Sequence, residues 1–387
     1  MSGVRFEFAT ATRVVFGPGS LAELGPIAAS FGSRALLVTG RSPERAEAAR
    51  ERLLAEGVAS IAFSVIGEPT VGDARRGADL ARSEDVDLVV ACGGGSAIDA
   101  GKAVAALLGN GGDPLHYLEV VGRGQPIALP SAPFVAIPTT AGTGSEVTRN
   151  AVLSSPEHRV KASLRSPLML PRAAIVDPDL LLGLPPHVVA ASGLDALAQV
   201  VEPFLSVRAN PLVDALCREG LARSARSLRR AFEGDRSEAV RVDLALASLF
   251  GGLALANAGL GAVHGLAAPI GGLFDAPHGS ACAALLPAVL RVNLAALSRR
   301  RPESPALDRY REIAAILTGR SAAEAQDGVA WVESLVRALQ VPGLSHWGAS
   351  VSDVPALVAK ARAASSMKGN PVELDEAELA EIVSASL

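Results

Sequence analysis

A buried strand that runs through a glycine-rich turn into a helix is the feature that most constrains this chain. Residues 88–102 have the sequence LVVACGGGSAIDAGK. The near-continuous apolar stretch suits a strand covered on both faces, as in a parallel sheet. Gly94, Gly95 and Ser96 let a ligand approach the backbone, and the helix that follows offers free N–H groups to a phosphate. Asp99 is expected in the first turn of that helix, where a carboxylate suits the helix dipole.

Two standard nucleotide-binding motifs do not fit this turn. The Gly-x-Gly-x-x-Gly pattern fails because Ile98 occupies its third glycine position. The phosphate loop of nucleoside triphosphatases fails because Gly95 and Gly101 are one residue too far apart and Ala103 replaces its Ser or Thr. Taken alone, this motif is therefore also compatible with a tight strand–helix turn that binds no ligand.

A second turn strengthens the case for a cofactor. Residues 138–148, PTTAGTGSEVT, directly follow the apolar run FVAI. The hydroxyls of Thr139, Thr140, Thr143 and Ser145 can hydrogen-bond a pyrophosphate or a ribose with little steric demand. Two glycine turns at the carboxyl ends of strands in one α/β sheet are what a dinucleotide site needs.

A third turn bears on the choice of cofactor. The run ALLVT is followed by Gly40, Arg41 and Ser42. An acidic residue here would bond the ribose hydroxyls and repel a 2′-phosphate, whereas Arg41 can pair with that phosphate. The sequence therefore slightly favours NADP, or use of both NADP and NAD. An Arg41 that only faces solvent is the alternative.

The first half of the chain alternates short β-rich runs with helical patterns. Strands are expected at residues 13–16, 35–39, 61–65, 88–91 and 134–137, and helices at residues 44–56 and 71–83. This alternation predicts an α/β dinucleotide-binding domain over residues 1–179, a parallel sheet with helices on both faces. Residues 180–387 are rich in Ala and Leu with helical periodicity, which predicts an all-α C-terminal domain.

Composition excludes several classes of protein. A length of 387 residues suits two domains, and a net charge of -4 without a basic block argues against nucleic acid and anionic membranes as partners. Cys92, Cys217 and Cys282 have no paired spacing, so we expect no disulfide framework and a reducing compartment. Charged residues interrupt the N-terminal segment; no signal peptide is expected, and a cytoplasmic location is predicted.

Residues 244–274 form an uncharged stretch with the length of a membrane span. Glycines recur through it, and Asn257 and His264 are polar. We therefore expect a buried, closely packed pair of helices here.

His264 and His278 stand out from the six histidines because they flank an almost uncharged segment. Gly271, Gly272 and Pro277 are expected to break the helix between them, so that the chain folds back and brings the two rings together. A pair of satisfied core histidines is the alternative. The other four histidines are interpreted as ordinary surface or capping residues.

Asp195 and Gln199 are one turn apart in a mostly apolar helix that Ser192 is expected to cap. A carboxylate in such a helix needs a partner, which can be a metal, a histidine or backbone N–H groups.

In their order along the chain, these motifs resemble the iron-containing (group III) alcohol dehydrogenases, including their maleylacetate-reductase relatives. The resemblance covers nearly the whole chain. It includes VVFGPGSLAELG, GEPT, GGGSAIDAGK, PTTAGTGSEVT, AIVDPDLL, GLDAL, HGLAAPIGG, PHG and GNPVEL.

The resemblance implies an NAD(P)-dependent oxidoreductase that interconverts a small alcohol and its aldehyde or ketone. It implies a dehydroquinate-synthase-like fold, with an α/β cofactor domain over residues 1–179, a helical metal and substrate domain over residues 180–387, and the site in the cleft. It also implies a homodimer or larger homo-oligomer. Many members hold Fe²⁺ or Zn²⁺ with one aspartate and three histidines. Asp195, His264 and His278 match three of these ligands, and Gln199 stands at the fourth.

Two departures leave the mechanism open. Gln199 and Ala268 stand where the family carries histidine, and an amide oxygen is a weaker ligand than imidazole. Maleylacetate reductases work without a metal. A metal-assisted dehydrogenase and a metal-independent, maleylacetate-reductase-like carbonyl reductase therefore both stay open. A dehydroquinate-synthase-like lyase and an inactive cofactor-binding protein are further alternatives.

The expected chemistry takes place at the cluster Asp195, Gln199, His264 and His278. A metal there would polarise the carbonyl as a Lewis acid. Without a metal, one histidine would act as the general acid, supported by Asp195, and Gln199 would donate a hydrogen bond to the oxygen. Lys161 is expected to reach the substrate or a cofactor phosphate.

Overall fold

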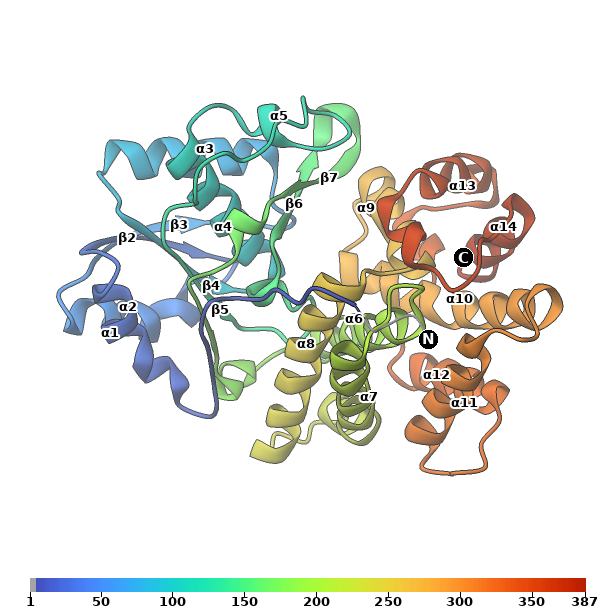
Figure 1. Cartoon of the computed structure of the whole chain (residues 1–387). Helices are drawn as coiled ribbons and strands as arrows, with labels where there is room; N and C mark the ends of the chain where they lie inside the picture. Colours follow the sequence, from blue (N-terminus) through green and yellow to red (C-terminus); the bar gives the residue numbers. More distant parts are fainter. Residues whose placement is uncertain (1–4) are drawn as a thin grey trace. The chain divides into compact units, whose positions relative to one another are not determined.

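The computed structural model describes residues 5–387, which fall into two compact units. Residues 10–183 form an α/β unit, and residues 184–387, together with residues 5–9, form a helical unit. Both predicted fold classes, an α/β N-terminal domain and an all-α C-terminal domain, are confirmed (Figure 1). The cofactor, metal and substrate roles given to residues 1–179 and 180–387 stay predictions.

The α/β unit is built on a six-stranded sheet whose strands are all parallel. In the order β1-β8-β5-β4-β2-β3, its strands are β1 (Val14–Phe16), β8 (Ala173–Val176), β5 (Phe134–Pro138), β4 (Leu88–Gly93), β2 (Arg34–Thr39) and β3 (Ala59–Ser64). After β2 the chain forms β3, at one edge of the sheet. After β4 it forms β5 and then β8, on the other side of the switch between β2 and β4. The carboxyl ends of β2 and β4 therefore meet at a topological switch point, where open α/β sheets bind ligands.

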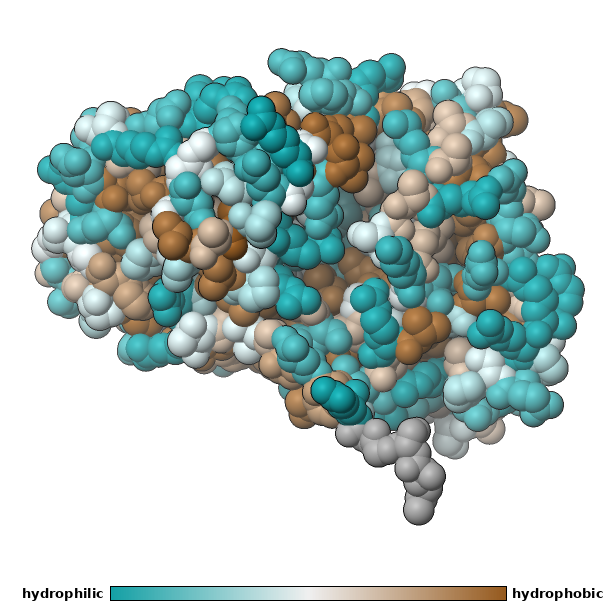
Figure 2. Space-filling view, turned by 45° about the horizontal axis from the view of Figure 1, so that its top comes forward, coloured by the Kyte–Doolittle hydropathy of each residue, from teal (hydrophilic) through white to brown (hydrophobic). Residues whose placement is uncertain are grey.

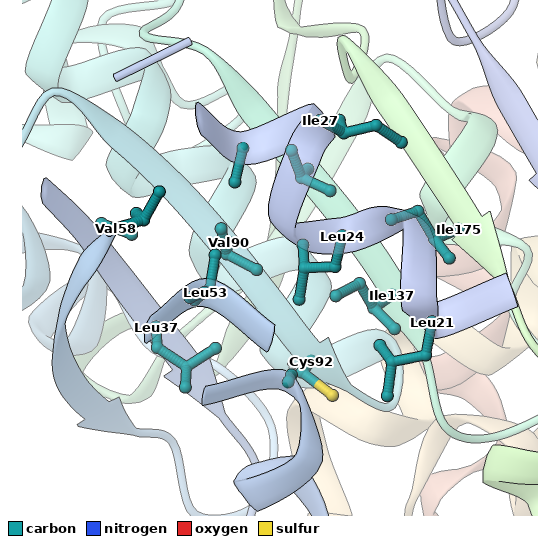
Figure 3. Close-up of a cluster of buried hydrophobic side chains, with 14 of the residues drawn as sticks. Leu21, Leu24, Ile27, Leu37, Leu53, Val58, Val90, Cys92, Ile137 and Ile175 are labelled. Carbon is teal, nitrogen blue, oxygen red and sulfur yellow. The ribbon is translucent and has the colours of Figure 1, made fainter. Parts of the chain in front are cut away.

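Helices cover both faces of this sheet. They are α1 (Leu24–Ala29), α2 (Glu47–Ala55), α3 (Val71–Ser83) and α4 (Gly95–Asn110), and the short α5 (Pro114–Tyr117) lies against α3. Leu37, Val90 and Ile137 point from the strands into a cluster with residues of α1 and α2 (Figure 3). Their strand neighbours Leu36 and Val89 pack on the other face, against α4. Burial of each such side chain stabilises the fold by about 1.5–3 kcal/mol.

The structure adds a β-hairpin that the sequence patterns did not predict. Strands β6 (Asn150–Ser155) and β7 (Val160–Arg165) pair antiparallel. The turn between them contains Arg159 in the left-handed region, at φ 50°. Hairpin turns of this kind usually carry Gly or Asn, so the sequence lacked its usual signal.

The helical unit consists of α6 to α14. Their bounds are α6 (Pro186–Leu205), α7 (Pro211–Phe232), α8 (Glu238–Ala258), α9 (Ala262–Phe274), α10 (His278–Arg300), α11 (Pro305–Thr318), α12 (Ala325–Ala338), α13 (Val354–Arg362) and α14 (Glu376–Ala385). α6 lies against α7, α8 and α10, and α9 lies against α10 and α13. Because α6, α9 and α10 are neighbours, side chains from three separate segments can meet.

Three of these helices, α6, α8 and α10, are long and apolar enough to cross a membrane by length and composition alone. Within the structure, 83%, 56% and 72% of their apolar windows are buried. The uncharged stretch 244–274 forms α8 and α9, which Gly259 separates at φ 71°; this is the predicted pair of helices. On the face drawn in Figure 2, hydrophobic residues lie in small groups among hydrophilic ones.

Candidate functional site

Three turns follow β2, β4 and β5 at the carboxyl edge of the parallel sheet. The turns after β2 and β4 are in close contact, since a Cβ on Gly93 would lie 3.3 Å from the backbone nitrogen of Gly40. Arg41 and Ser42, which follow Gly40, are both exposed. Gly40, Arg41 and Ser42 therefore lie beside the switch point, where an incoming ribose or phosphate would reach them.

The turns after β4 and β5 also touch, and glycine makes this contact possible. A Cβ on Gly95 would lie 2.7 Å from Oγ1 of Thr143, and a Cβ on Gly94 would lie 3.2 Å from Oγ1 of Thr140. Gly94 is the N-cap of α4, and no described side chain caps that helix end. The free N–H groups of its first turn are the kind of donors that bind a phosphate. Ser96, in that first turn, is partly exposed.

A buried lysine holds the loop after β5 against α4. Nζ of Lys102, on a side chain 1% exposed, donates to Oγ and the carbonyl oxygen of Ser145, both at 2.8 Å. It also donates to Oγ1 of Thr148 at 3.0 Å and to the carbonyl oxygen of Asn150 at 2.6 Å. Four acceptors compensate for the buried cation, so Lys102 fixes the shape of the loop.

Asp99 belongs to the same network. Its carboxylate accepts a hydrogen bond from Oγ of Ser145 and another from the backbone N–H of Val152, at 3.0 Å. The helix begins at Gly95 and its first turn holds no acidic residue, so the expected position of Asp99 in that turn is wrong. Asp99 and Ser145 position the loop.

Glu146 is a second buried ionisable group in this loop. Its side chain is 2% exposed, and burial raises the pKa of Glu146 to about 7, although a backbone hydrogen bond and the Lys102 charge both act to lower it. Burial also lowers the pKa of Lys102, while Asp99 and Glu146 act to raise it. The ionisation of the loop therefore changes near neutral pH.

Two further predicted residues have defined places in the α/β unit. Thr139 is buried, and its backbone N–H donates to the carbonyl oxygen of Gly93 at 2.9 Å. Nζ of Lys161 lies 3.4 Å from Oε1 of Glu68, and the Lys161 side chain is 5% exposed. Lys161 therefore pairs with the GEPT motif in this structure.

The second group of predicted residues comes together in the helical unit. Asp195 on α6, His264 on α9 and His278 on α10 converge. Oδ1 of Asp195 lies 3.3 Å from Nε2 of His264 and 3.7 Å from Nε2 of His278. The two imidazole rings are 5.3 Å apart, centroid to centroid. The expected meeting of the two histidines is confirmed.

The fold-back between the histidines uses other residues than those expected. α9 continues through Gly271 and Gly272 to Phe274, so these glycines do not break the helix. It ends at Asp275, which adopts the left-handed region at φ 52°, and α10 begins at His278 after Pro277. Asp and Asn tolerate this conformation better than most residues, and Pro277 sets the start of the next helix.

The expected cap of α6 is also wrong. Ser192 lies inside the helix, which begins at Pro186, and its Oγ donates to the carbonyl oxygen of Val188 at 2.7 Å. Asp195 and Gln199 thus lie in the middle of a buried helix, each 1% exposed.

Sequence reasoning missed two members of this group. Sγ of Cys282 lies 3.7 Å from Nε2 of His278, one helical turn earlier on α10. Oε2 of Glu202 lies 2.6 Å from Nδ1 of His264, and Oε1 accepts the backbone N–H of Val263 at 2.7 Å. The sequence spacing could have indicated both residues. Cys282 follows His278 by four residues and Glu202 follows Asp195 by seven, so each pair shares one face of its helix.

The charges in the cluster favour protonated histidines. Burial acts to lower the pKa of His278, but Cys282 and Asp195 outweigh it and raise that pKa to about 9. Burial likewise opposes protonation of His264, yet Cys282, Glu202 and Asp195 raise its pKa well above the usual value. Burial acts to raise the pKa of Asp195, but His278 and His264 lower it overall.

The cluster fits a divalent cation. One ligand atom from each of Asp195, His264, His278 and Cys282 lies within 4.8 Å of the other three. Oδ1 of Asp195 is buried and accepts no well-aligned hydrogen bond from the described residues. A buried carboxylate oxygen requires a positive partner. The protonated histidines provide one, and a metal ion that displaces their Nε2 protons would provide it as well.

Comparison with known proteins identifies the family. The profile described as iron-containing alcohol dehydrogenase matches residues 11–178, and that of the C-terminal part of the same family matches residues 189–387. The chain belongs to the iron-containing alcohol dehydrogenase family. The family is enzymatic, so this chain is an oxidoreductase of the alcohol dehydrogenase class, and the predicted resemblance is confirmed.

Several members of this iron-containing family are similar over most or nearly all of the chain. The 1,3-propanediol dehydrogenase of Klebsiella pneumoniae is 34% identical over 99% of both chains. The lactaldehyde reductase of Escherichia coli is 33% identical over 86% of this chain and 85% of its own. A crystal structure of 1,3-propanediol oxidoreductase gives a TM-score of 0.91 at 33% identity, over 99% of this chain and 100% of that one.

A crystal structure of the sulfoacetaldehyde reductase of Bifidobacterium kashiwanohense, in complex with NAD⁺, gives a TM-score of 0.85 at 27% identity. It covers 99% of both chains.

Proposed function

We propose that this enzyme interconverts a small alcohol and its aldehyde or ketone, with NAD(P) as the redox cofactor and a divalent cation, Fe²⁺ or Zn²⁺, at the catalytic cluster. The observation that carries the proposal is the convergence of Asp195, His264 and His278 around a buried carboxylate oxygen. The names of the relatives, 1,3-propanediol dehydrogenase and lactaldehyde reductase, support short-chain alcohols and aldehydes as the substrate class.

The cofactor-binding residues are proposed from the three adjoining turns of the α/β unit. Gly94, Gly95 and Ser96 at the start of α4 would bind the pyrophosphate through backbone N–H groups. Thr140 and Thr143, both partly exposed, would donate hydrogen bonds beside them. Thr139, Asp99 and Ser145 would hold this loop in shape, and Lys161 would reach the substrate or a cofactor phosphate. The NAD⁺ complex of the sulfoacetaldehyde reductase relative supports a nicotinamide cofactor.

Arg41 is proposed to select the phosphorylated cofactor. None of the three residues directly after β2, Gly40, Arg41 and Ser42, is acidic, and Arg41 is exposed. A guanidinium at this point can form charge-assisted hydrogen bonds with a 2′-phosphate. We therefore place NADP ahead of NAD, with some use of both.

In the proposed reaction a carbonyl carbon gains a hydride and its oxygen gains a proton. A bound NAD(P)H would supply the hydride and solvent the proton, and a cation held by Asp195, His264 and His278 would polarise the carbonyl oxygen as a Lewis acid. Glu202 accepts from Nδ1 of His264 and so leaves Nε2 facing Asp195. This contact fixes the ring and the tautomer, as carboxylate partners of metal-binding histidines do. Gln199 lies on the same buried helix, one turn from Asp195, and would offer its amide to the same site.

The test combines elemental analysis with a substrate panel. Protein purified without chelator should contain about one divalent ion per chain. It should oxidise NADPH, and more slowly NADH, with short aldehydes, and it should lose this activity to a chelator. Clear turnover by metal-free protein would instead favour the metal-independent carbonyl reductase. Tight cofactor binding without turnover on any aldehyde, ketone or alcohol would overturn the proposal. A homo-oligomer and a cytoplasmic location are also proposed, and sedimentation and cell fractionation test them.

A further inference from the structure

Cys282 is a buried thiol that lies among charged ligand groups rather than in an apolar core. It is fully buried, and its Sγ is 3.7 Å from Nε2 of His278. Cys92 is a useful contrast, because it lies in the apolar cluster between the sheet and α1 and α2 (Figure 3). There, burial raises the pKa of Cys92 to about 12, so that thiol stays neutral. Cys282 instead lies beside a carboxylate and two imidazoles, which can be ligands of one shared cation.

Three of the six separations between ligand atoms in the cluster are close to the edges of a tetrahedron around zinc. Zinc bonds of about 2.1 Å to N and O and about 2.3 Å to S give ideal edges of about 3.4 Å between N and O and about 3.6 Å between N and S. The observed distances are 3.3 Å from Asp195 Oδ1 to His264 Nε2, 3.7 Å from Asp195 Oδ1 to His278 Nε2, and 3.7 Å from His278 Nε2 to Cys282 Sγ. All four atoms lie within 4.8 Å of one another, so one ion can contact all four once the remaining separations contract toward the ideal edges.

A second observation at the same place points to a cation. Asp195 is 1% exposed, and its Oδ1, which faces both histidines, accepts no well-aligned hydrogen bond from the described residues. The thiol alone would not define a site. A thiol, two imidazoles and an oxygen that lacks a donor, all within 4.8 Å, do define one.

We propose that the Cys282 thiolate is the fourth protein ligand of this site, so that the donor set is Asp195, His264, His278 and Cys282. A substrate carbonyl oxygen would then bind as a fifth ligand, an expansion that catalytic zinc sites can make. A thiolate favours zinc over harder ions, and an oxygen, two nitrogens and one sulfur in a tetrahedron are a zinc donor set. The chain therefore selects Zn²⁺ over Fe²⁺, although its family is named for iron. This inference rests on the proposed metal-assisted function and specifies its ion.

The test uses Co²⁺ as a spectroscopic substitute for zinc. Metal-stripped full-length protein loaded with Co²⁺ should develop a sulfur-to-cobalt charge-transfer band in the near ultraviolet, with the strong visible bands of tetrahedral cobalt. Cys282→Ala should lose the charge-transfer band. The matched control is Cys217→Ala, because Cys217 is equally buried in the same helical unit and lies on α7. That variant should keep the band.

A competition titration with a chromophoric chelator gives an independent readout. Cys282→Ala removes a proposed ligand and should weaken Zn²⁺ binding at least about tenfold. Even the loss of a residue that only hydrogen-bonds to a ligand typically lowers metal affinity 10–100-fold. The Fe²⁺ affinity should change less, so the Zn²⁺ to Fe²⁺ preference should fall. Cys282→Ser, which keeps the size of the side chain, repeats both measurements if the alanine variant folds poorly.

The outcomes separate this inference from the proposed function. A cobalt-loaded wild type without the charge-transfer band, or a band that survives in Cys282→Ala, overturns the thiolate ligand even if the enzyme reduces aldehydes. A wild type that binds neither Co²⁺ nor Zn²⁺ also overturns it. A band that depends on Cys282, in protein that turns over no alcohol or aldehyde, supports the zinc site and counts against the proposed function alone.

Discussion

Oε2 of Glu202 lies 2.6 Å from Nδ1 of His264, while Oε1 of the same carboxylate accepts the backbone N–H of Val263. Asn370 accepts the neighbouring N–H of Ala262 at 3.1 Å, so two side chains cap the start of α9. Gly261 allows this approach, because a Cβ there would lie 2.8 Å from Asn370 Oδ1 and 2.9 Å from Glu202 Oε1. One glutamate thus stabilises the helix end and orients the ring of His264.

Replacing Glu202 should weaken metal binding without unfolding the protein. In Glu202→Gln the amide oxygen can still accept the N–H of Val263 or Nδ1–H of His264, but the negative charge is gone. Loss of a carboxylate behind a metal-binding histidine typically costs 10–100-fold in affinity, so we expect a loss in this range for Zn²⁺. Chelator competition measures it. Glu219→Gln, an exposed ion-pair residue on α7, is the control; equal losses in both variants would contradict the orienting role.

His264→Ala should separate chemistry from cofactor binding. His264 is 6% exposed and contacts both Asp195 and Glu202, whereas the glycine turns belong to another unit. We expect kcat to fall by at least about 100-fold, the lower bound for losing a group that assists proton transfer or polarises the carbonyl. The Kd for NADPH, measured by its fluorescence, should stay unchanged. His187→Ala, an exposed position on α6, should keep full turnover; wild-type turnover in His264→Ala would remove His264 from the site.

The sequence predicted those parts of the site that depend on local chemistry. Asp195, His264 and His278 were identifiable because a charged or ionisable group in an apolar helix needs a partner. The three glycine turns were identifiable because each follows an apolar strand. The parallel sheet followed from the alternation of strands and helices, and helix α3 matches its predicted bounds, Val71–Ser83.

Contacts between separate helices could not be predicted in the same way. Glu202 reaches His264 only because α6 and α9 are neighbours, and no local pattern encodes that packing. No sequence pattern around Lys102 indicates its four acceptors, because they lie more than forty residues further along the chain. The break between α9 and α10 was assigned to Gly271 and Gly272, yet glycine in a buried helix costs only about 1 kcal/mol relative to alanine. Packing compensates for a cost of that size.

Arg41 should control the choice between the two nicotinamide cofactors. A guanidinium bonded to the 2′-phosphate is worth about 1.5–3 kcal/mol, so Arg41→Ala should raise KM for NADPH at least about tenfold. KM for NADH should stay within about twofold, because NADH has no phosphate at this position. Steady-state kinetics with one aldehyde and both cofactors measure this, and Arg52→Ala, exposed on α2, is the control. Equal changes for both cofactors would show that Arg41 does not discriminate between them.

Glu146 should make the α/β unit less stable as the pH rises toward neutrality. Burial raises its pKa from 4.5 to about 7 in the folded chain, so at intermediate pH the folded state holds a proton that the unfolded chain has released. The stabilisation is complete below about pH 4.5 and is lost as the pH rises to about 7, by up to about 3 kcal/mol in total. Glu146→Gln stays neutral and avoids this loss.

Tryptophan fluorescence does not report on the α/β unit, because both tryptophans, Trp331 and Trp347, lie in the helical unit. Hydrogen exchange of the β4 and β5 amides is therefore the suitable measurement. Compared at the same pH, these amides should be better protected in Glu146→Gln than in the wild type at about pH 8, and nearly equal at about pH 5. Exposed Glu157→Gln should change neither value. Equal protection of wild type and Glu146→Gln at both pH values would mean that Glu146 ionises in the folded chain as readily as in the unfolded one.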